Sequence, residues 1–175
     1  MEDALVSGLD SLSPPDSHYV NAAWGWLELD NIDEAFAELE RVSHPAQCHP
    51  ETLTLRWELL ARQKRWHEAL DIGRCLAQTA PDRADSWVKQ SYALHELKRT
   101  QEAWDALCAV CEGFPDVSTI PYNLACYACQ LDQGGAALAW LRKAMKIGRK
   151  EPIRKMALQD KDLESLWPEI KSLKV

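Results

Sequence analysis

The sequence predicts an all-α chain built from repeated pairs of helices, and three observations support this. The stretches "NIDEAFAEL", "RWHEALDIG", "RTQEAWDAL" and "QGGAALAWL" align without gaps at a period of 34 residues. Apolar residues within a repeat recur at helical spacing, as Ala69, Ile72 and Leu76 do. The dipeptide Pro-Asp recurs with the same period, at Pro81 and Pro115. A fixed period of this length is typical of repeat architectures.

Each repeat predicts two short helices that run antiparallel. Short polar stretches such as "LKRTQ" separate the two helices of a repeat. Pro81 and Pro115 end the second helix because proline lacks an amide proton, and Asp82 or Ser118 then caps the next helix. The second helix of each repeat has an alanine at the same position; these residues are Ala35, Ala69, Ala103 and Ala137.

The repeats resemble the tetratricopeptide repeat, whose pattern has a small residue at position 8, Ala at 20 and Pro at 32. Position 20 is Ala in all four repeats, and the match covers about residues 16–151. The stretch "ALQDKDLESLW" resembles the closing segment of a bacterial group of these proteins, in which Asp-x-Asp-Leu follows the final repeat. The resemblance implies a right-handed superhelical solenoid of four helix-turn-helix units with a C-terminal capping helix. Its implied boundaries are 1–15 for an N-terminal extension, 16–49, 50–83, 84–117 and 118–151 for the units, and 152–175 for the cap.

The second repeat departs from the pattern at two positions. Trp57 stands where a small residue is expected, and Gly73 stands where a large one belongs. We expect the Trp57 indole to fill the space that the missing side chain at Gly73 leaves, since volume-conserving changes are tolerated best.

Charge and hydropathy exclude several classes of function. The net charge is −7, and residues 1–141 hold 10 bases against 22 acids, whereas residues 142–175 hold 10 bases against 5 acids. The acidic body argues against nucleic acid, which needs clustered positive charge. No apolar run approaches the ~18 residues that span a bilayer, and the acidic start "MEDALVSGLD" does not resemble a signal peptide. We therefore expect no membrane contact, a cytoplasmic location and reduced thiols.

The basic run near the C-terminus is expected to be a solvated helix face, and whether it contacts nucleic acid or an acidic partner stays open. It consists of Arg142, Lys143, Lys146, Arg149, Lys150, Arg154 and Lys155.

Two Cys-x-x-Cys pairs, Cys108 with Cys111 and Cys126 with Cys129, have the sequence spacing of a zinc site. Zinc needs four sulfurs at about 2.3 Å, but a helix pair turning near Pro115 would offset the two cysteine pairs by roughly 9 Å along the helix axis. We therefore expect packing residues and no metal or other cofactor. The sequence has no phosphate loop and no nucleophile elbow, so no enzyme is predicted.

The resemblance implies a non-catalytic scaffold that binds a peptide or helix of a partner protein in a concave groove. Because the implied groove is aromatic and mostly acidic, we expect a partner with basic and apolar groups. A secretion-type chaperone and a cysteine-based metal or redox protein remain as alternatives, and the oligomeric state stays open. Carried over position by position, the groove comprises Trp24, Glu28, Glu58, Arg62, Tyr92, His95, Glu96, Tyr122, Asn123, Cys126, Cys129 and Gln130, with Asn123 placed to bond a peptide backbone.

Overall fold

The chain divides into two bodies, which are described separately below. The structure is a computed structural model that describes residues 11–173, so residues 1–10 of the expected N-terminal extension and the last two residues of the expected cap lie outside it. The N-terminal body ends at Lys64 and the C-terminal body begins at Arg65. This division falls inside the second predicted repeat, and the boundaries of the four repeat units stay a prediction.

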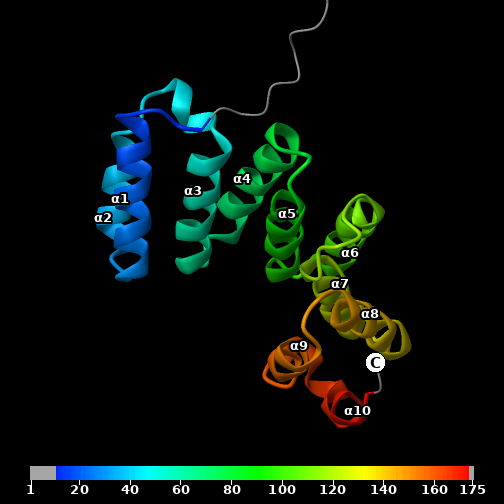
Figure 1. The fold of residues 1–175 in the computed structure, drawn as a ribbon. Helices are drawn as coiled ribbons and strands as arrows, with labels where there is room; N and C mark the ends of the chain where they lie inside the picture. The colour runs from blue at the N-terminus through cyan, green and yellow to red at the C-terminus, as the bar shows by residue number, and fades with distance from the viewer. Residues whose placement is uncertain (1–10, 174–175) are drawn as a thin grey trace, which may run out of the picture. The chain divides into compact units, whose positions relative to one another are not determined.

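The N-terminal body is a small helical cluster in which α1 packs against α2 and α3 (Figure 1). Its core includes Val20 and Leu27 of α1, Leu39 of α2 and Leu55 of α3. The Asn31 side chain caps α2 by accepting from an amide in the first turn. The elements are α1 (Asp16–Glu28), α2 (Ile32–Glu40), the 3-10 helix η1 (Pro45–Cys48) and α3 (Pro50–Arg62).

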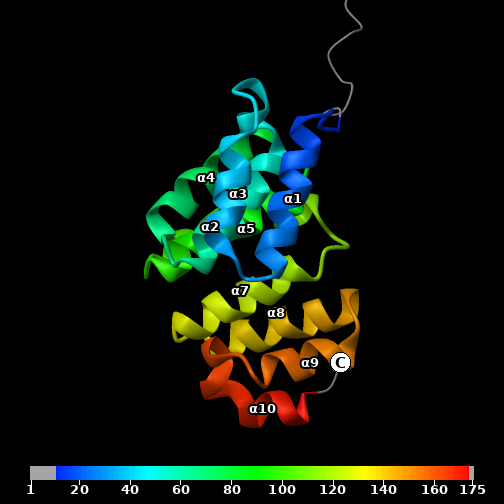
Figure 2. The same ribbon diagram turned by 90° about the vertical axis from the view of Figure 1, so that its left-hand side faces the viewer.

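The C-terminal body continues as a chain of packed helices. Helix α5 packs against α4, α6 and α7, and α7 packs against α8. Figure 2 shows α7, α8, α9 and α10 following one another in chain order. The elements are α4 (Trp66–Thr79), α5 (Ala84–Glu96), α6 (Thr100–Cys108), η2 (Cys111–Gly113), α7 (Thr119–Gln130), α8 (Gly134–Ile147), α9 (Lys150–Ala157), η3 (Lys161–Leu166) and α10 (Trp167–Ser172).

The 34-residue period reappears in the backbone of the turns. Asp30, Lys64, Lys98 and Asp132 have φ values of 57°, 56°, 63° and 60°, and each lies between the two helices of a repeat. A residue in this left-handed conformation ends a helix and lets the following amides bond back to it. The amide of Arg99, which follows Lys98, donates to the carbonyl of Leu94 at 2.9 Å.

The repeated alanines are buried. Ala35, Ala69 and Ala103 have 0% of their surface exposed, and Ala137 has 1%. Because a methyl group is the smallest apolar side chain, these positions let neighbouring backbones approach. All regular elements among residues 11–173 are helices, so the predicted all-α class is confirmed. None of the helices in this described part is both long and apolar enough to cross a membrane.

The glycine at position 73 has a different role from the one expected. A Cβ atom at Gly73 would lie 2.8 Å from the Cα atom of Gln90 and 3.0 Å from its amide nitrogen. The main chain of α5 therefore occupies the space beside α4. The expectation that the Trp57 indole fills this space is wrong, because backbone atoms are already there.

The expected C-terminal cap consists of α9, η3 and α10. The Arg154 guanidinium holds the end of the chain by donating to the carbonyls of Lys171 at 3.2 Å and Leu173 at 2.8 Å. The Trp167 indole N–H donates to the carbonyl of Ala157 at 3.0 Å. Between these helices, η3 turns back onto α7. This return places the Asp-x-Asp-Leu stretch against the first helix of the last repeat.

Candidate peptide-binding face

The N-terminal body holds four of the twelve predicted groove residues. Trp24 is half-buried and packs against the core of this body. Glu28 is exposed and Glu58 is half-buried. The exposed Arg62 guanidinium bonds to the Asp30 carboxylate at 2.9 Å. Arg62 is therefore engaged by a residue of the neighbouring helix pair, which sequence reasoning did not pair with it.

The other eight predicted residues belong to two packed helices of the C-terminal body. We call this set the α5–α7 face. The segment Asp160–Ser165, which contains most of η3, bonds to five of its members. The α5–α7 face consists of Tyr92, His95 and Glu96 of α5 and Tyr122, Asn123, Cys126, Cys129 and Gln130 of α7.

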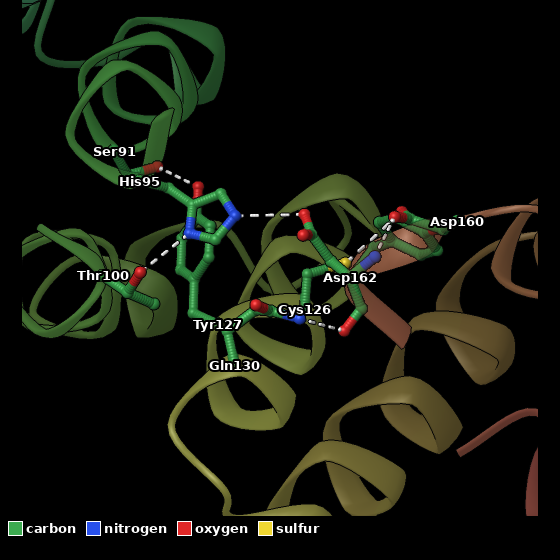
Figure 3. A network of polar contacts seen from close by, with 9 residues as sticks. Ser91, His95, Thr100, Cys126, Tyr127, Gln130, Asp160 and Asp162 are labelled. Atoms are coloured by element: carbon green, nitrogen blue, oxygen red, sulfur yellow. Dashed lines mark hydrogen bonds and ion pairs between the residues drawn. The ribbon is translucent and has the colours of Figure 1, made fainter. Parts of the chain in front are cut away.

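His95 joins α5 to the returning segment (Figure 3). Its Nε2 atom lies 3.0 Å from the Asp162 carboxylate, and its Nδ1 atom lies 3.0 Å from the Thr100 hydroxyl. Since a carboxylate accepts, Nε2 carries the proton that is donated to Asp162. The Tyr127 ring lies 5.0 Å from the imidazole and is itself held by a hydrogen bond to Ser91. The imidazole thus has a fixed orientation, and its hydrogen bond lowers the pKa of Asp162 below its ordinary value.

The second carboxylate of the segment, that of Asp160, is bonded by α7. The Tyr122 hydroxyl donates to it at 2.8 Å, and the Cys126 thiol donates at 3.6 Å. Burial raises the pKa of Cys126, and the negative charges of Asp160 and Asp162 raise it further. Burial likewise raises the pKa of Tyr122, with the neighbouring carboxylates adding to the effect. Both groups therefore stay protonated and act as donors.

The main chain and the apolar side chain of the segment are also held. The Gln130 amide donates to the carbonyl of Asp162 at 2.8 Å. The Cys129 thiol lies 3.2 Å from the Ser165 hydroxyl. Leu163, directly after Asp162, has 1% of its surface exposed. The face therefore bonds two carboxylates and one backbone carbonyl, while a leucine is buried beside them.

The three remaining residues of the face are engaged within their own surroundings. The Tyr92 ring meets the Trp66 ring edge-on at 5.8 Å. Burial, followed by the charge and hydrogen bond of Glu96, raises the pKa of Tyr92 to about 12. The Asn123 amide donates to the carbonyl of Thr119 at 2.9 Å, so this amide group is used inside α7.

The segment on the α5–α7 face is acidic, whereas we expected a partner with basic groups. The expectation rested on formal charges such as that of Glu96, but the groups that bond the two carboxylates of the segment are the hydrogen-bond donors Tyr122, Cys126 and His95. Sequence reasoning missed Asp160, Asp162 and Ser165 as partners of the face. Two carboxylates spaced by one residue and followed by a leucine were visible in "QDKDLES", but nothing in the sequence indicated where this stretch folds.

The thiols form no metal site in the part of the chain described here. All six cysteines are free, and Cys126 and Cys129 are buried. Among residues 11–173 no group of three or more His, Cys, Asp and Glu side chains is arranged to hold a metal ion.

Comparison with known proteins identifies the fold. No family model matches the chain, and no curated protein matches it. A solved structure of TTC0263, a thermophilic TPR protein in Thermus thermophilus, superposes with a TM-score of 0.72 at 17% identity, covering 89% of this chain and 82% of that one. The chain has a tetratricopeptide-repeat fold.

Two further structures share this tetratricopeptide-repeat fold with the chain. PilF of Pseudomonas aeruginosa gives a TM-score of 0.72 at 18% identity, over 89% of this chain and 69% of that one. MamA from Desulfovibrio magneticus RS-1 gives 0.69 at 17% identity, over 93% and 97%. At these identities the likeness concerns the fold alone. The α5–α7 face therefore has to be interpreted from its own contacts.

Proposed function

We propose that the chain is a non-catalytic protein-interaction module of the cytoplasm, which binds a peptide or helix of a partner protein along the first helices of its repeats. The observation that carries this proposal is the engagement of the α5–α7 face. Five of its eight residues hold a separate stretch of polypeptide by its side chains and one main-chain carbonyl. A face that binds a segment in this way has the donors that peptide recognition requires.

We propose a second contact surface on the N-terminal body, for the same partner or another. Its sequence up to Lys64 holds twelve acids and four bases, a net charge of −8. Trp24 offers a half-buried ring near the exposed end of α1, where Glu28 lies. Aromatic side chains contribute much of the energy of protein interfaces. We propose that this surface binds apolar and basic groups.

A redox or metal function has weaker physical support. A reactive thiol must ionise readily, which requires a lowered pKa. Burial instead raises the pKa of Cys126, and it also raises the pKa of Cys108. A chaperone for a secreted partner remains a special case of the interaction module, because it would use the same surfaces.

The proposed function is tested by quantitative affinity capture from a lysate of the source cells. The immobilised full chain is compared with Trp24→Ala and with Gln78→Ala, a matched control at an exposed position of α4. We expect specific proteins to be retained by wild type and by the control, and their yield to fall at least about tenfold with Trp24→Ala, the loss typical of an aromatic hot spot. Equal retention by all three chains would exclude the N-terminal surface as the binding site.

A further inference from the structure

The α5–α7 face engages some positions of its covering segment and leaves others exposed. Asp160 and Asp162 are bonded to the face (Figure 3). Leu163 is buried, whereas Lys161 and Glu164 are exposed. The face therefore distinguishes particular positions of the segment. A short acidic stretch of the form Asp-x-Asp-Leu is the pattern that satisfies it.

The donors of the face are suited to carboxylates and poorly suited to other groups. Tyr122, with 8% of its surface exposed, and Cys126, with 4%, both point their protons at Asp160. His95, 5% exposed, donates to Asp162, and the charge of Lys98 favours the same carboxylate. A basic ligand would leave these buried donors without acceptors, which costs more than the bonds themselves contribute.

We propose that the α5–α7 face is a receptor for short acidic segments of the pattern Asp-x-Asp-Leu in partner proteins. In the free chain, residues Asp160–Ser165 occupy the receptor in cis, and a partner segment of the same pattern binds by displacing them. This inference rests on the proposed function, because it names the class of ligand that one surface of the interaction module accepts.

The covering segment competes with a partner segment for the face, because it is attached at both ends by α9 and α10. Its attachment gives it a high effective concentration, on the order of millimolar for short connections. A partner segment therefore binds with an apparent affinity reduced by the fraction of chains in which the face is open. Weakening the segment in cis should strengthen binding in trans, provided that the face itself is unchanged.

The test uses a fluorescent peptide with the sequence of residues 158–167, LQDKDLESLW, titrated with the full chain. The double variant Asp160→Asn/Asp162→Asn alters only the covering segment. Glu164→Gln is the matched control, since Glu164 is an exposed residue of the same segment. We expect the double variant to bind the peptide about tenfold more tightly than wild type or the control, or more. A peptide with both aspartates replaced, LQNKNLESLW, should not bind.

A second readout reports opening of the face directly. Alkylation of Cys126 by iodoacetamide, located by peptide mass mapping, should be slow in wild type because the thiol is buried. It should be faster in the double variant and slow again when the LQDKDLESLW peptide is added. If the double variant loses its circular dichroism spectrum, Asp162→Asn alone takes its place.

Three results would overturn the proposal. A folded double variant whose Cys126 reacts faster but which does not bind the peptide at millimolar concentration would mean that the segment is only a structural cap. Equal binding to wild type and double variant would place the peptide elsewhere. A wild-type dimer that forms with rising concentration and dissociates on adding the peptide would assign the face to a second copy of the chain. The titration needs no partner from the lysate, so its failure is distinguishable from failure of the capture experiment.

Discussion

Replacing Gly73 with alanine tests how α4 and α5 come into contact. The substitution adds one methyl group, and its carbon would lie 2.8 Å from the Cα atom and 3.0 Å from the amide nitrogen of Gln90. Both of these atoms belong to the main chain of α5, so no side-chain rotation relieves the clash. The helices must separate locally, or α4 must shift.

Two effects of opposite sign determine the size of the change. Alanine in place of glycine inside a helix contributes about 1 kcal/mol of stability through helix propensity. Forcing an extra methyl group into a packed interface costs about 1 to 3 kcal/mol. The net change expected for Gly73→Ala is therefore between no effect and a loss of about 2 kcal/mol.

Gly135→Ala isolates the steric part of this change. Gly135 lies in α8 of the same body, and a Cβ atom there would meet no atom within 4 Å. This variant should be as stable as wild type or up to about 1 kcal/mol more stable. The free energy of unfolding of each chain is measured by urea denaturation followed by circular dichroism. If Gly73→Ala proved as stabilising as Gly135→Ala, the close approach of α5 at this glycine would be refuted.

Two further predictions concern a turn and a carboxylate. Lys64 has a φ of 56°, and this conformation costs a residue with a side chain about 1 to 2 kcal/mol, whereas glycine adopts it freely. Lys64→Gly should therefore raise the midpoint of thermal unfolding slightly, and Lys64→Ala should not. Asp162 has a lowered pKa in the folded chain, so its contribution to stability is present above about pH 3.9 and is lost as the pH falls through the folded value. The stability difference between wild type and Asp162→Asn, measured by urea denaturation, should therefore be largest near neutral pH and should shrink below about pH 4; a difference independent of pH would contradict a role for the Asp162 charge.

Much of the fold could be predicted because the same local sequence pattern recurs in four repeats. The alanines that recur at a period of 34 residues, Ala35, Ala69, Ala103 and Ala137, are all buried. The left-handed turn residues could not be predicted in the same way. Neither Lys64 nor Lys98 is a residue type that favours this conformation, so the helix pairing imposes it. Gly73 was misinterpreted for a related reason. A glycine shows that a side chain is absent, but the sequence does not show which neighbouring element packs into that space.

The position of the α5–α7 face could be predicted from the sequence, but the segment that lies against it could not, and the role of the face in peptide binding stays a prediction. Position within the repeat places Tyr122, Cys126 and Gln130 on one side of α7, and this follows from helical periodicity alone. The direction of the chain after α9 depends on tertiary contacts such as those of Arg154 with the chain end, which no local pattern encodes. A motif can therefore be recognised in the sequence although the surface against which it packs cannot be predicted.

The electrostatic character of the α5–α7 face shows why formal charge alone did not indicate which segment of the chain lies against it. A charged side chain at the surface is hydrated, and its interaction with another exposed charge contributes little. A buried donor has lost its water and needs an acceptor, so it determines what lies against it. Tyr122, Cys126 and His95 are such donors, and they bond an acidic segment on a face that itself includes the acidic residue Glu96. Predicting ligands from sequence on a helical repeat face therefore requires counting buried donors and acceptors before counting charges.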